Sequence, residues 1–226
     1  MAESAVPAEQ TAPLALRSVE RALARRYSAY AEEVERLIRA GVAVMRRGGG
    51  AEPRVGDIVA EAGLSNQAFY RHFRSKDELL MAILDDGQRQ LVSYLRHQMA
   101  KEAAPAGKVR RWVEGIMAQA ADPAAAENTR AVVANTDRVK HRFPVELTGA
   151  DEVICAPLRQ VLEEAGSTDP GRDAQAIYRM VMASMHACLI RQAPPTRRDV
   201  DHLVAFALAG AGLESSPAAR GGRRGA

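Results

Sequence analysis

The side chains with the clearest chemistry lie in one short segment, residues 64–76 of the 226-residue chain. It carries three fixed positive charges, Arg71, Arg74 and Lys76, and no acidic residue. Residues 28–78 as a whole balance acidic against basic side chains, so the positive charge is concentrated locally. Guanidinium and ammonium groups bind phosphate oxygens, and guanidinium groups also bind base edges. A local cluster of this kind is the electrostatic pattern expected of a nucleic-acid contact.

Two short helices are predicted to position these side chains. Residues 55–62 predict a helix that ends at Gly63, because glycine is common just past the end of a helix. Ser65 is a suitable N-cap for a second helix over residues 66–73. Two short helices joined by a tight turn form a helix-turn-helix. Its apolar side chains, which we expect to face the neighbouring helices, are Ile58, Val59, Ala62, Leu64, Phe69 and Phe73.

The rest of the chain also predicts helices. Apolar residues recur at three- and four-residue spacing, and no sustained alternation of β-branched residues indicates a strand. Ser75 with Glu78, and Thr196 with Asp199, have the spacing of capping boxes that open two of the helices. We therefore predict an all-α fold of about nine helices, over residues 28–47, 55–62, 66–73, 76–101, 107–121, 125–141, 146–165, 171–192 and 197–212.

One set of residues forms a pattern across the helix-turn-helix and the start of the next helix: Asp57, Ile58, Ala62, Gly63, Leu64, Ser65, Phe69, Tyr70, His72, Phe73, Lys76, Leu79 and Leu80. In these residues and their spacing, the chain resembles the DNA-binding domain of the tetracycline-repressor-like (TetR) family of transcription regulators. The remaining helices are similar to the family's architecture but carry none of its motifs. The likeness therefore rests on the N-terminal helices.

The resemblance implies a division of the chain and a homodimer. Residues 28–76 would form a three-helix helix-turn-helix domain on DNA, and residues 77–213 a helical ligand-binding and dimerisation domain. Residues 1–27 are expected to be a partly disordered N-terminal extension, with a candidate helical continuation over residues 19–26. Residues 214–226, rich in arginine and glycine, are expected to be a disordered tail.

Residue roles follow from the resemblance and from side-chain chemistry. Tyr70 and Lys76 resemble the family's phosphate contacts, one through a hydroxyl group and the other as a point charge at a helix N-terminus. Asn66, Gln67 and Arg71 are candidates for contacts with base edges, because amides and guanidinium groups match the hydrogen-bonding edges of the major groove.

Two further residues of this segment have two interpretations each. Three positions depart from the family pattern. Ser65 is either the helix cap or a phosphate contact, and His72 is either a phosphate contact or plain exposed surface. Arg54 stands where the family usually has a serine or threonine cap, Val59 where it has a small alanine, and Gln67 where it often has a glycine. These departures bear on the DNA sequence that is bound.

The C-terminal helices predict either a small-molecule pocket or an ordinary apolar core. Methionine side chains are flexible, and they serve equally in an adaptable pocket and as core filler. An apolar wall of this kind favours a hydrophobic or amphipathic ligand over a sugar or a phosphate. The expected lining comprises Trp112, Met117, Val133, Ile154, Leu158, Tyr178, Met182, Met185 and His186.

The last predicted helix is apolar nearly all round, so it must be buried on more than one side. Small residues at Ala207, Gly210 and Ala211 permit close helix contact. Together with the preceding helix it suits a four-helix bundle between two copies of the chain, and a core within one chain is the alternative.

Other function classes find no support in the sequence. The chain lacks the serine-hydrolase, zinc-protease and P-loop motifs, so we expect neither an enzyme nor a cofactor. His141, Cys155, His186 and Cys188 do not have metal-ligand spacing, so no metal site is expected. Two cysteines suit a reducing compartment, and neither a signal peptide nor a membrane-spanning run is read, which predicts a cytoplasmic protein.

The sequence therefore predicts a dimeric transcription regulator that binds a pseudo-palindromic double-stranded DNA operator. The favoured mechanism is a repressor released by a hydrophobic or amphipathic effector. One alternative is a constitutive DNA-binding regulator without an effector. The other is a helical lipid-binding protein or enzyme with a vestigial DNA head, which the joint presence of Tyr70, Arg71 and Lys76 disfavours.

Overall fold

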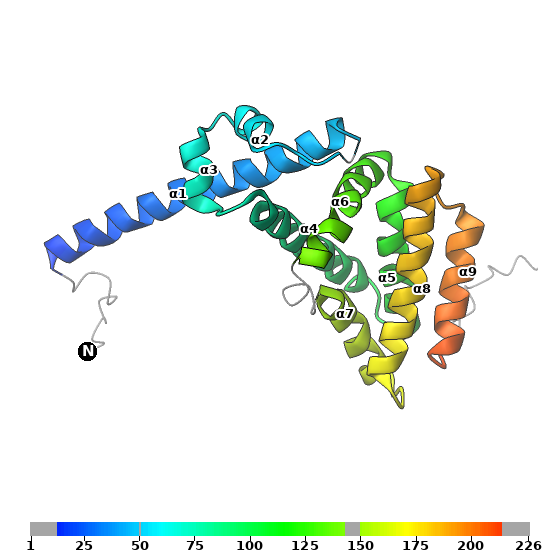
Figure 1. Cartoon of the computed structure of the whole chain (residues 1–226). Coiled ribbons are helices and arrows are strands. Elements are labelled where there is room, and N and C mark those ends of the chain that lie inside the picture. Colours follow the sequence, from blue (N-terminus) through cyan, green and yellow to red (C-terminus); the bar gives the residue numbers. More distant parts are fainter. Residues whose placement is uncertain (1–12, 50, 143–149, 214–226) are drawn as a thin grey trace, which may run out of the picture.

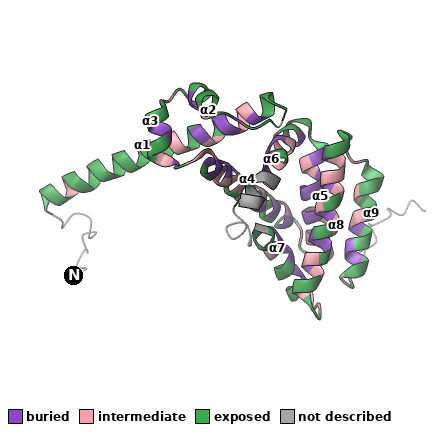
Figure 2. Cartoon of the chain, viewed as in Figure 1, coloured by how far each residue is buried: buried purple, intermediate pink, exposed green. Residues whose placement is uncertain are grey.

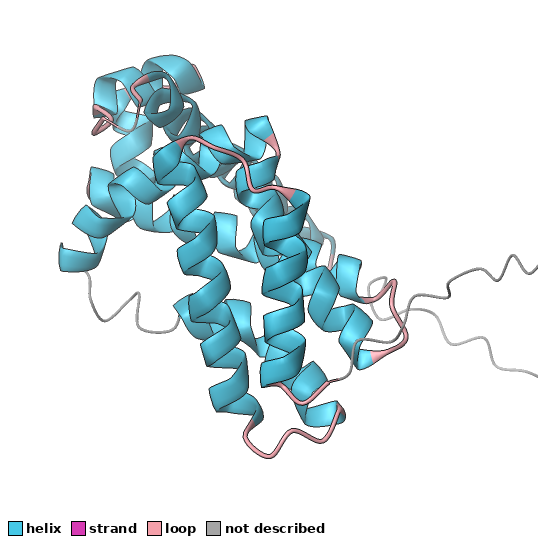
Figure 3. Ribbon diagram, turned by 90° about the vertical axis from the view of Figure 1, so that its right-hand side faces the viewer, coloured by secondary structure: helices cyan, strands magenta, loops and turns pink. Residues whose placement is uncertain are grey.

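The computed structural model describes residues 13–49, 51–142 and 150–213, and within them it is all-helical, as the sequence predicts (Figure 3). The expected disorder at the N-terminus and in the tail falls on residues 1–12 and 214–226, which lie outside the described residues. The helices are α1 Leu14–Arg47, α2 Val55–Ala62, α3 Asn66–His72, α4 Lys76–Met99, α5 Pro105–Ala121, α6 Pro123–Arg142, α7 Ala150–Glu164, α8 Pro170–Arg191 and α9 Arg197–Gly210.

The first helix is longer than predicted. It begins at Leu14 rather than near Ser28, and Pro13 is its N-cap. No proline interrupts the chain from there to Gly48, and alanine, leucine, arginine and glutamate, all strong helix formers, predominate. The N-terminal half of α1 consequently projects as a free arm beside α3 (Figure 1).

A first core joins α1, α2, α3 and the first turns of α4, which together we call the head. Leu37, Ile58 and Phe69 are fully buried in it. At Gly41 the helices α1 and α4 come so close that a Cβ atom would lie 2.7 Å from Cδ1 of Ile83. The glycine therefore leaves room for the Ile83 side chain between the two helices.

A second core fills the body, which consists of the rest of α4 and of α5 to α9. Helix α5 lies at its centre and packs against α4, α6, α7, α8 and α9. Trp112 of α5 is fully buried, and its Nε1 donates a hydrogen bond of 3.3 Å to the carbonyl oxygen of Ile154. Helix α4 contributes to both cores and thus connects the head to the body (Figure 1).

The two predicted capping boxes differ in the structure. At α9 the box between Thr196 and Asp199 is complete. At α4 the Ser75 hydroxyl accepts from the backbone N–H of Glu78, but the Glu78 carboxylate accepts from the backbone N–H of Arg74, at 2.6 Å, instead of that of Ser75. The start of α4 is capped all the same, because two backbone donors find acceptors.

Candidate nucleic-acid interface

The turn between α2 and α3 follows from two residues. Gly63 adopts a left-handed conformation (φ 62°), which glycine reaches without steric cost. The backbone N–H of Leu64 then donates to the carbonyl oxygen of Val59 at 2.9 Å. Ser65 caps α3, since its hydroxyl accepts from the backbone N–H of Ala68 at 3.1 Å. The turn and the cap together fix the direction of α3.

Helix α3 presents a polar face to solvent and an apolar face to the head core. Asn66, Gln67, Tyr70 and Arg71 are exposed, with Tyr70 at 60%. Phe69 is buried on the opposite face and supports the Tyr70 ring edge-on, with ring centroids 5.2 Å apart. The structure thus brings together four of the side chains that the sequence proposes for DNA contact.

The C-terminal end of α3 is tied to α1 through one carboxylate. Arg71 Nη2 donates to Glu33 Oε2 at 2.5 Å, and His72 Nε2 lies 2.6 Å from the same oxygen. The Arg71 guanidinium lies over the Tyr30 ring, 5.2 Å from its centroid, and the His72 ring meets that ring edge-on. Only 8% of the His72 side chain is exposed. His72 is therefore not plain exposed surface, which is one of the two interpretations that the sequence leaves open.

These contacts change the protonation of Glu33. The hydrogen bonds from His72 and then from Arg71 stabilise the carboxylate and lower the pKa of Glu33 below its ordinary value. At neutral pH the carboxylate is therefore ionised and holds Arg71 against α1.

Lys76 is also paired. Its ammonium group binds the carboxylate of Glu52, in the loop before α2. Glu52, Glu33 and Tyr30 are not among the residues that the sequence proposes for this interface. A signal existed for two of them: Glu33 and Tyr30 precede buried Leu37 by four and seven residues, so they share its side of α1.

Comparisons with known proteins agree with this geometry. Residues 37–83, which span the head from the middle of α1 into α4, match the profile of bacterial regulatory proteins of the tetR family. Over these residues the chain carries a TetR-family domain. Its helix-turn-helix is accordingly a DNA-binding element, and the chain is a transcription regulator. No curated protein matches the sequence.

Solved structures share the fold of most of the chain. A TetR-family transcriptional regulator from Streptomyces coelicolor superposes with a TM-score of 0.59 at 20% identity, over 80% of this chain and 93% of the other. A regulatory protein of the tetR family from Rhodococcus RHA1 gives 0.60 at 17% identity, over 81% and 98%. The fatty acid degradation regulator FadR from Bacillus halodurans gives 0.61 at 16% identity, over 80% and 93%. At these identities the likeness concerns the fold alone.

The body contains an apolar cavity where it meets the head. Its volume is about 470 Å³, and α1, α4, α5, α6 and α8 all contribute to its wall. Polar side chains interrupt the apolar surface on several sides, so the wall is amphipathic. The lining residues are Ile38, Val42, Ile83, Leu84, Asp86, Gly87, Gln88, Gln90, Leu91, Tyr94, Gln119, Ala125, Asn128, Thr129, Val132 and Met185.

This cavity lies in a different place from the predicted pocket, and of the expected residues it includes only Met185. Five others are buried in the body core: Trp112, Met117, Ile154, Leu158 and Tyr178. Val133, Met182 and His186 are partly buried. The core residues pack against one another because the body helices close around α5, which leaves the hollow at the head–body junction.

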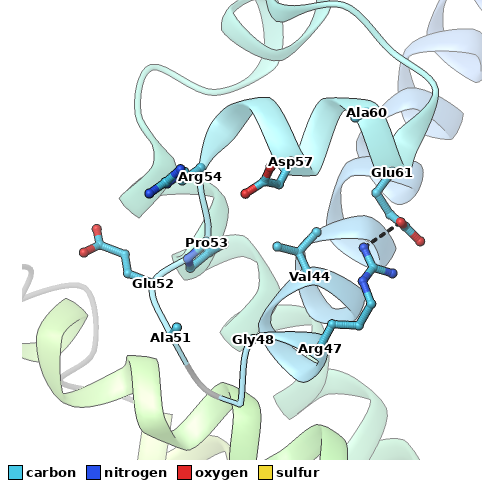
Figure 4. A pocket seen from close by; sticks show the side chains of 10 residues that line it. All are labelled: Val44, Arg47, Gly48, Ala51, Glu52, Pro53, Arg54, Asp57, Ala60 and Glu61. Carbon is cyan, nitrogen blue, oxygen red and sulfur yellow. Dashed lines mark hydrogen bonds and ion pairs between the residues drawn. The ribbon is translucent and has the colours of Figure 1, made fainter.

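A larger hollow, of about 750 Å³, lies between the end of α1 and α2 (Figure 4). Its wall is charged, and Arg47 and Glu61 of that wall form an ion pair at 2.7 Å. The wall contains few apolar side chains, namely Val44, Ala51, Pro53 and Ala60. Its composition does not suit the hydrophobic ligand that the sequence predicts.

The predicted dimer residues separate into buried and exposed ones. Ala207 is 1% exposed within its own chain, because this side of α9 packs against α5. Its side chain is therefore part of the intrachain core. The prediction that Ala207 lies in a dimer interface does not agree with this burial. Gly210 is exposed and Ala211 is partly buried. The exposed face of α9 carries Phe206, at 62%.

Within the described residues, no group of three or more histidine, cysteine, aspartate or glutamate side chains is placed to hold a metal ion. Burial raises the pKa of the Cys155 thiol to about 12, so at neutral pH it is protonated. In the same part of the chain, every helix is too short or too polar to cross a membrane.

Proposed function

We propose that the chain acts in the cytoplasm as a homodimeric repressor of a pseudo-palindromic operator and is released by a hydrophobic or amphipathic effector. In this proposal residues 28–76 bind DNA and residues 77–213 bind the effector and the second copy. The observation that carries it is the exposed polar face of α3, which the Gly63 turn and the Glu33 contacts hold at a fixed angle.

The DNA contacts divide by chemistry. Asn66, Gln67 and Arg71 would reach base edges, and Tyr70 and Lys76 phosphates. Arg71 and Lys76 are ion-paired in the free protein. DNA therefore has to replace Glu33 and Glu52 as their partners. Ser65 acts as the cap, and the burial of His72 against α1 favours a supporting role for it.

The test begins with selection of bound fragments from genomic DNA, followed by binding measurements on the selected operator. Arg71→Ala and Gln67→Ala should each cost about 1–3 kcal/mol and relax base preference. Lys76→Ala should weaken binding to all sequences alike and reduce the salt slope by about one ion.

Lys101→Ala is a matched control, because Lys101 follows the other end of α4. Equal operator affinity for the wild type, this control and a Tyr70→Phe/Lys76→Ala double variant would contradict the assignment of α3 as the reading helix.

The dimer is proposed to form through the exposed faces of α8 and α9. Small and apolar side chains recur along α8 at Ala176, Met180, Ala183 and Ala187, and end at Ile190, which is 80% exposed. Exposed large apolar side chains in such a stripe are typical of a helix interface. Two heads joined in this way would enter successive major grooves about 34 Å apart.

Ala183→Arg should produce monomers that lose operator binding, because it places an unpaired charge at the centre of that stripe. Ala124→Arg, on the exposed surface of α6, should remain a dimer. Light scattering distinguishes them. A wild-type monomer at micromolar concentration would exclude the dimer.

The effector is proposed to bind the cavity of about 470 Å³, whose volume suits a small ligand. Ile38 and Val42 of α1 line it together with α4 and α6, so a ligand there would touch both head and body. It would release DNA only by preferring the state that does not bind DNA. Since one solved neighbour is a fatty acid degradation regulator, a fatty acid is the first probe.

Ala125→Phe should fill the cavity and abolish both the thermal shift and the DNA release caused by the probe. Ala124→Phe, one residue earlier and outside the lining, should leave them unchanged. A screen in which no hydrophobic compound stabilises the protein would favour the constitutive regulator without an effector.

A further inference from the structure

The N-terminal half of α1 is a helix without an intrachain partner. From Leu14 to Ala31 every side chain is exposed except that of Arg17, which is partly buried (Figure 2). The helix nonetheless continues without a break into the buried half of α1. Sixteen residues of it, 14–29, extend about 24 Å at 1.5 Å per residue. We call these residues the arm.

The arm carries most of the positive charge near α3. Residues 14–31 contain four arginines and a single acid, Glu20. The rest of the head, by contrast, has as many acidic as basic residues over 28–78. The long-range attraction of the head for an anion therefore comes mainly from the arm.

The arm's arginines are available, whereas two of the three cations in residues 64–76, Arg71 and Lys76, are engaged. Arg71, Lys76 and Arg47 each form an ion pair with a glutamate. Among the described residues, Arg17, Arg21, Arg25 and Arg26 form no ion pair with an acid. An anion that binds the arm does not have to displace a carboxylate first.

Helix geometry connects the arm to the reading helix. Arg17, Arg21 and Arg25 are four residues apart and form one ridge along α1, which continues through Ala29 to Glu33. Glu33 holds Arg71 of α3, so the ridge ends at the reading helix. Arg26 approaches the same place on a second path: its guanidinium lies 5.9 Å from the centroid of the Tyr30 ring, which also supports Arg71.

We propose that the arm is a second DNA-contacting element, whose arginines bind phosphates that flank the half-site under α3. The inference rests on the proposed function, because it requires that α3 binds DNA. Duplex DNA presents one phosphate charge per about 1.7 Å of its axis, so an arm of this length passes several phosphates. Phosphate contacts carry no base preference, so the arm adds affinity and not sequence selectivity.

A second copy of the chain is the rival occupant of the arm. Leu16, Val19, Leu23 and Tyr27 are exposed along one side of it and could pack against another helix. Charge favours DNA over this rival, because a second arm would bring four more arginines next to the first four. One result of the experiment below would therefore identify a second copy as the partner of the arm.

The experiment compares two triple variants of the full chain on the selected operator and on non-specific DNA. Arg21→Ala/Arg25→Ala/Arg26→Ala removes three charges from the arm, and alanine preserves the helix. Arg96→Ala/Lys101→Ala/Arg159→Ala removes three charges from exposed positions on the body outside α8 and α9 and is the matched control. Binding is measured from about 50 to 200 mM salt.

The arm variant should lose on the order of 10–100-fold in affinity near physiological salt, and equally on both DNAs. Its log–log salt slope should fall by about 0.9 for each lost phosphate contact, up to about 2.7. The control triple should keep the wild-type slope. Circular dichroism should show unchanged helix content for both variants.

Two results would overturn the inference. In one, the arm variant has the salt slope of the control, while wild-type protein binds the operator. In the other, Leu16→Gln/Leu23→Gln lowers both the molar mass in light scattering and the DNA affinity, while the arginine variant does neither; the arm then binds a second copy. If wild-type protein bound no DNA at any salt concentration, the proposed function itself would fail.

Discussion

The head and the body are held together by different means. In the head, the geometry of α3 depends on a left-handed glycine, a serine cap and a carboxylate shared between Arg71 and His72. In the body, helices close around fully buried side chains such as Trp112 and Leu158. The difference teaches that the exposed face of α3 is fixed by helix caps and polar contacts, whereas the body is fixed by apolar burial. Substitutions that remove a cap or a polar contact should consequently act on the head, and substitutions that remove buried apolar atoms should act on the body.

The largest effect is expected from truncation in the body core. Leu158→Ala should lower the free energy of unfolding by about 2–5 kcal/mol, because it removes a fully buried side chain and leaves a cavity. Val153→Ala, on the exposed side of the same helix, should change it by less than about 0.5 kcal/mol. Urea denaturation measures both. Equal losses in the free energy of unfolding for the two variants would mean that burial does not dominate the stability of the body.

The next effect concerns the turn of the head. Gly63→Ala should destabilise the protein by about 1–2 kcal/mol, because a Cβ atom is unfavourable in the left-handed conformation. Gly87→Ala offers the opposite case: Gly87 lies exposed inside α4 with open space around it, and alanine there should stabilise by about 0.8–1 kcal/mol. Thermal unfolding should therefore shift in opposite directions. A shift in the same direction would refute the conformational argument.

A smaller effect is expected at the cap of α3. Ser65→Ala should cost about 1 kcal/mol, since the backbone N–H of Ala68 loses its acceptor. It should also weaken operator binding, because α3 begins at this cap. Ser93→Ala, on the exposed face of α4, should be close to neutral in both measurements. A Ser65 variant with full stability and weaker DNA binding would instead identify the hydroxyl as a phosphate contact.

The smallest effect is a pH dependence in the head. Because the folded-state pKa of Glu33 is lowered, its contribution is present above the ordinary glutamate pKa and is lost as the pH falls through the folded-state value. Wild-type stability should therefore fall more between pH 5 and 3 than that of Glu33→Gln, by denaturation at about 0.5-unit pH steps. If the stabilities of the wild type and of Glu33→Gln changed in parallel with pH, the carboxylate would not stabilise the α1–α3 contact.

The same division explains how much the sequence could predict. Helices α2 and α3 were predicted almost to the residue, because Gly63 and Ser65 act on their immediate neighbours. The all-helical fold followed from apolar spacing. The sequence underestimates the length of the arm, because exposed alanines and arginines give no burial pattern even where they form a strong helix.

Contacts between distant segments were harder to predict. The pairing of Glu33 with Arg71 joins positions 38 apart, and nothing near either residue specifies the other. The cavity lies where five helices meet, so its position depends on how the core closes around α5. Ala207 was misplaced for a similar reason: a small residue suits close helix contact within a chain as well as between chains.

The continuity of α1 gives the arm a mechanical property. From Leu37, which is fully buried, to Leu14 the helix is about 35 Å long at 1.5 Å per residue. A tilt of about 5° around its buried half would displace the free end by about 3 Å, the length of a hydrogen bond. Ile38 and Val42, on the wall of the cavity, lie next to the pivot of this lever. A rotation at the cavity small enough to leave the head core intact is thus magnified at the tip into a movement that breaks a contact.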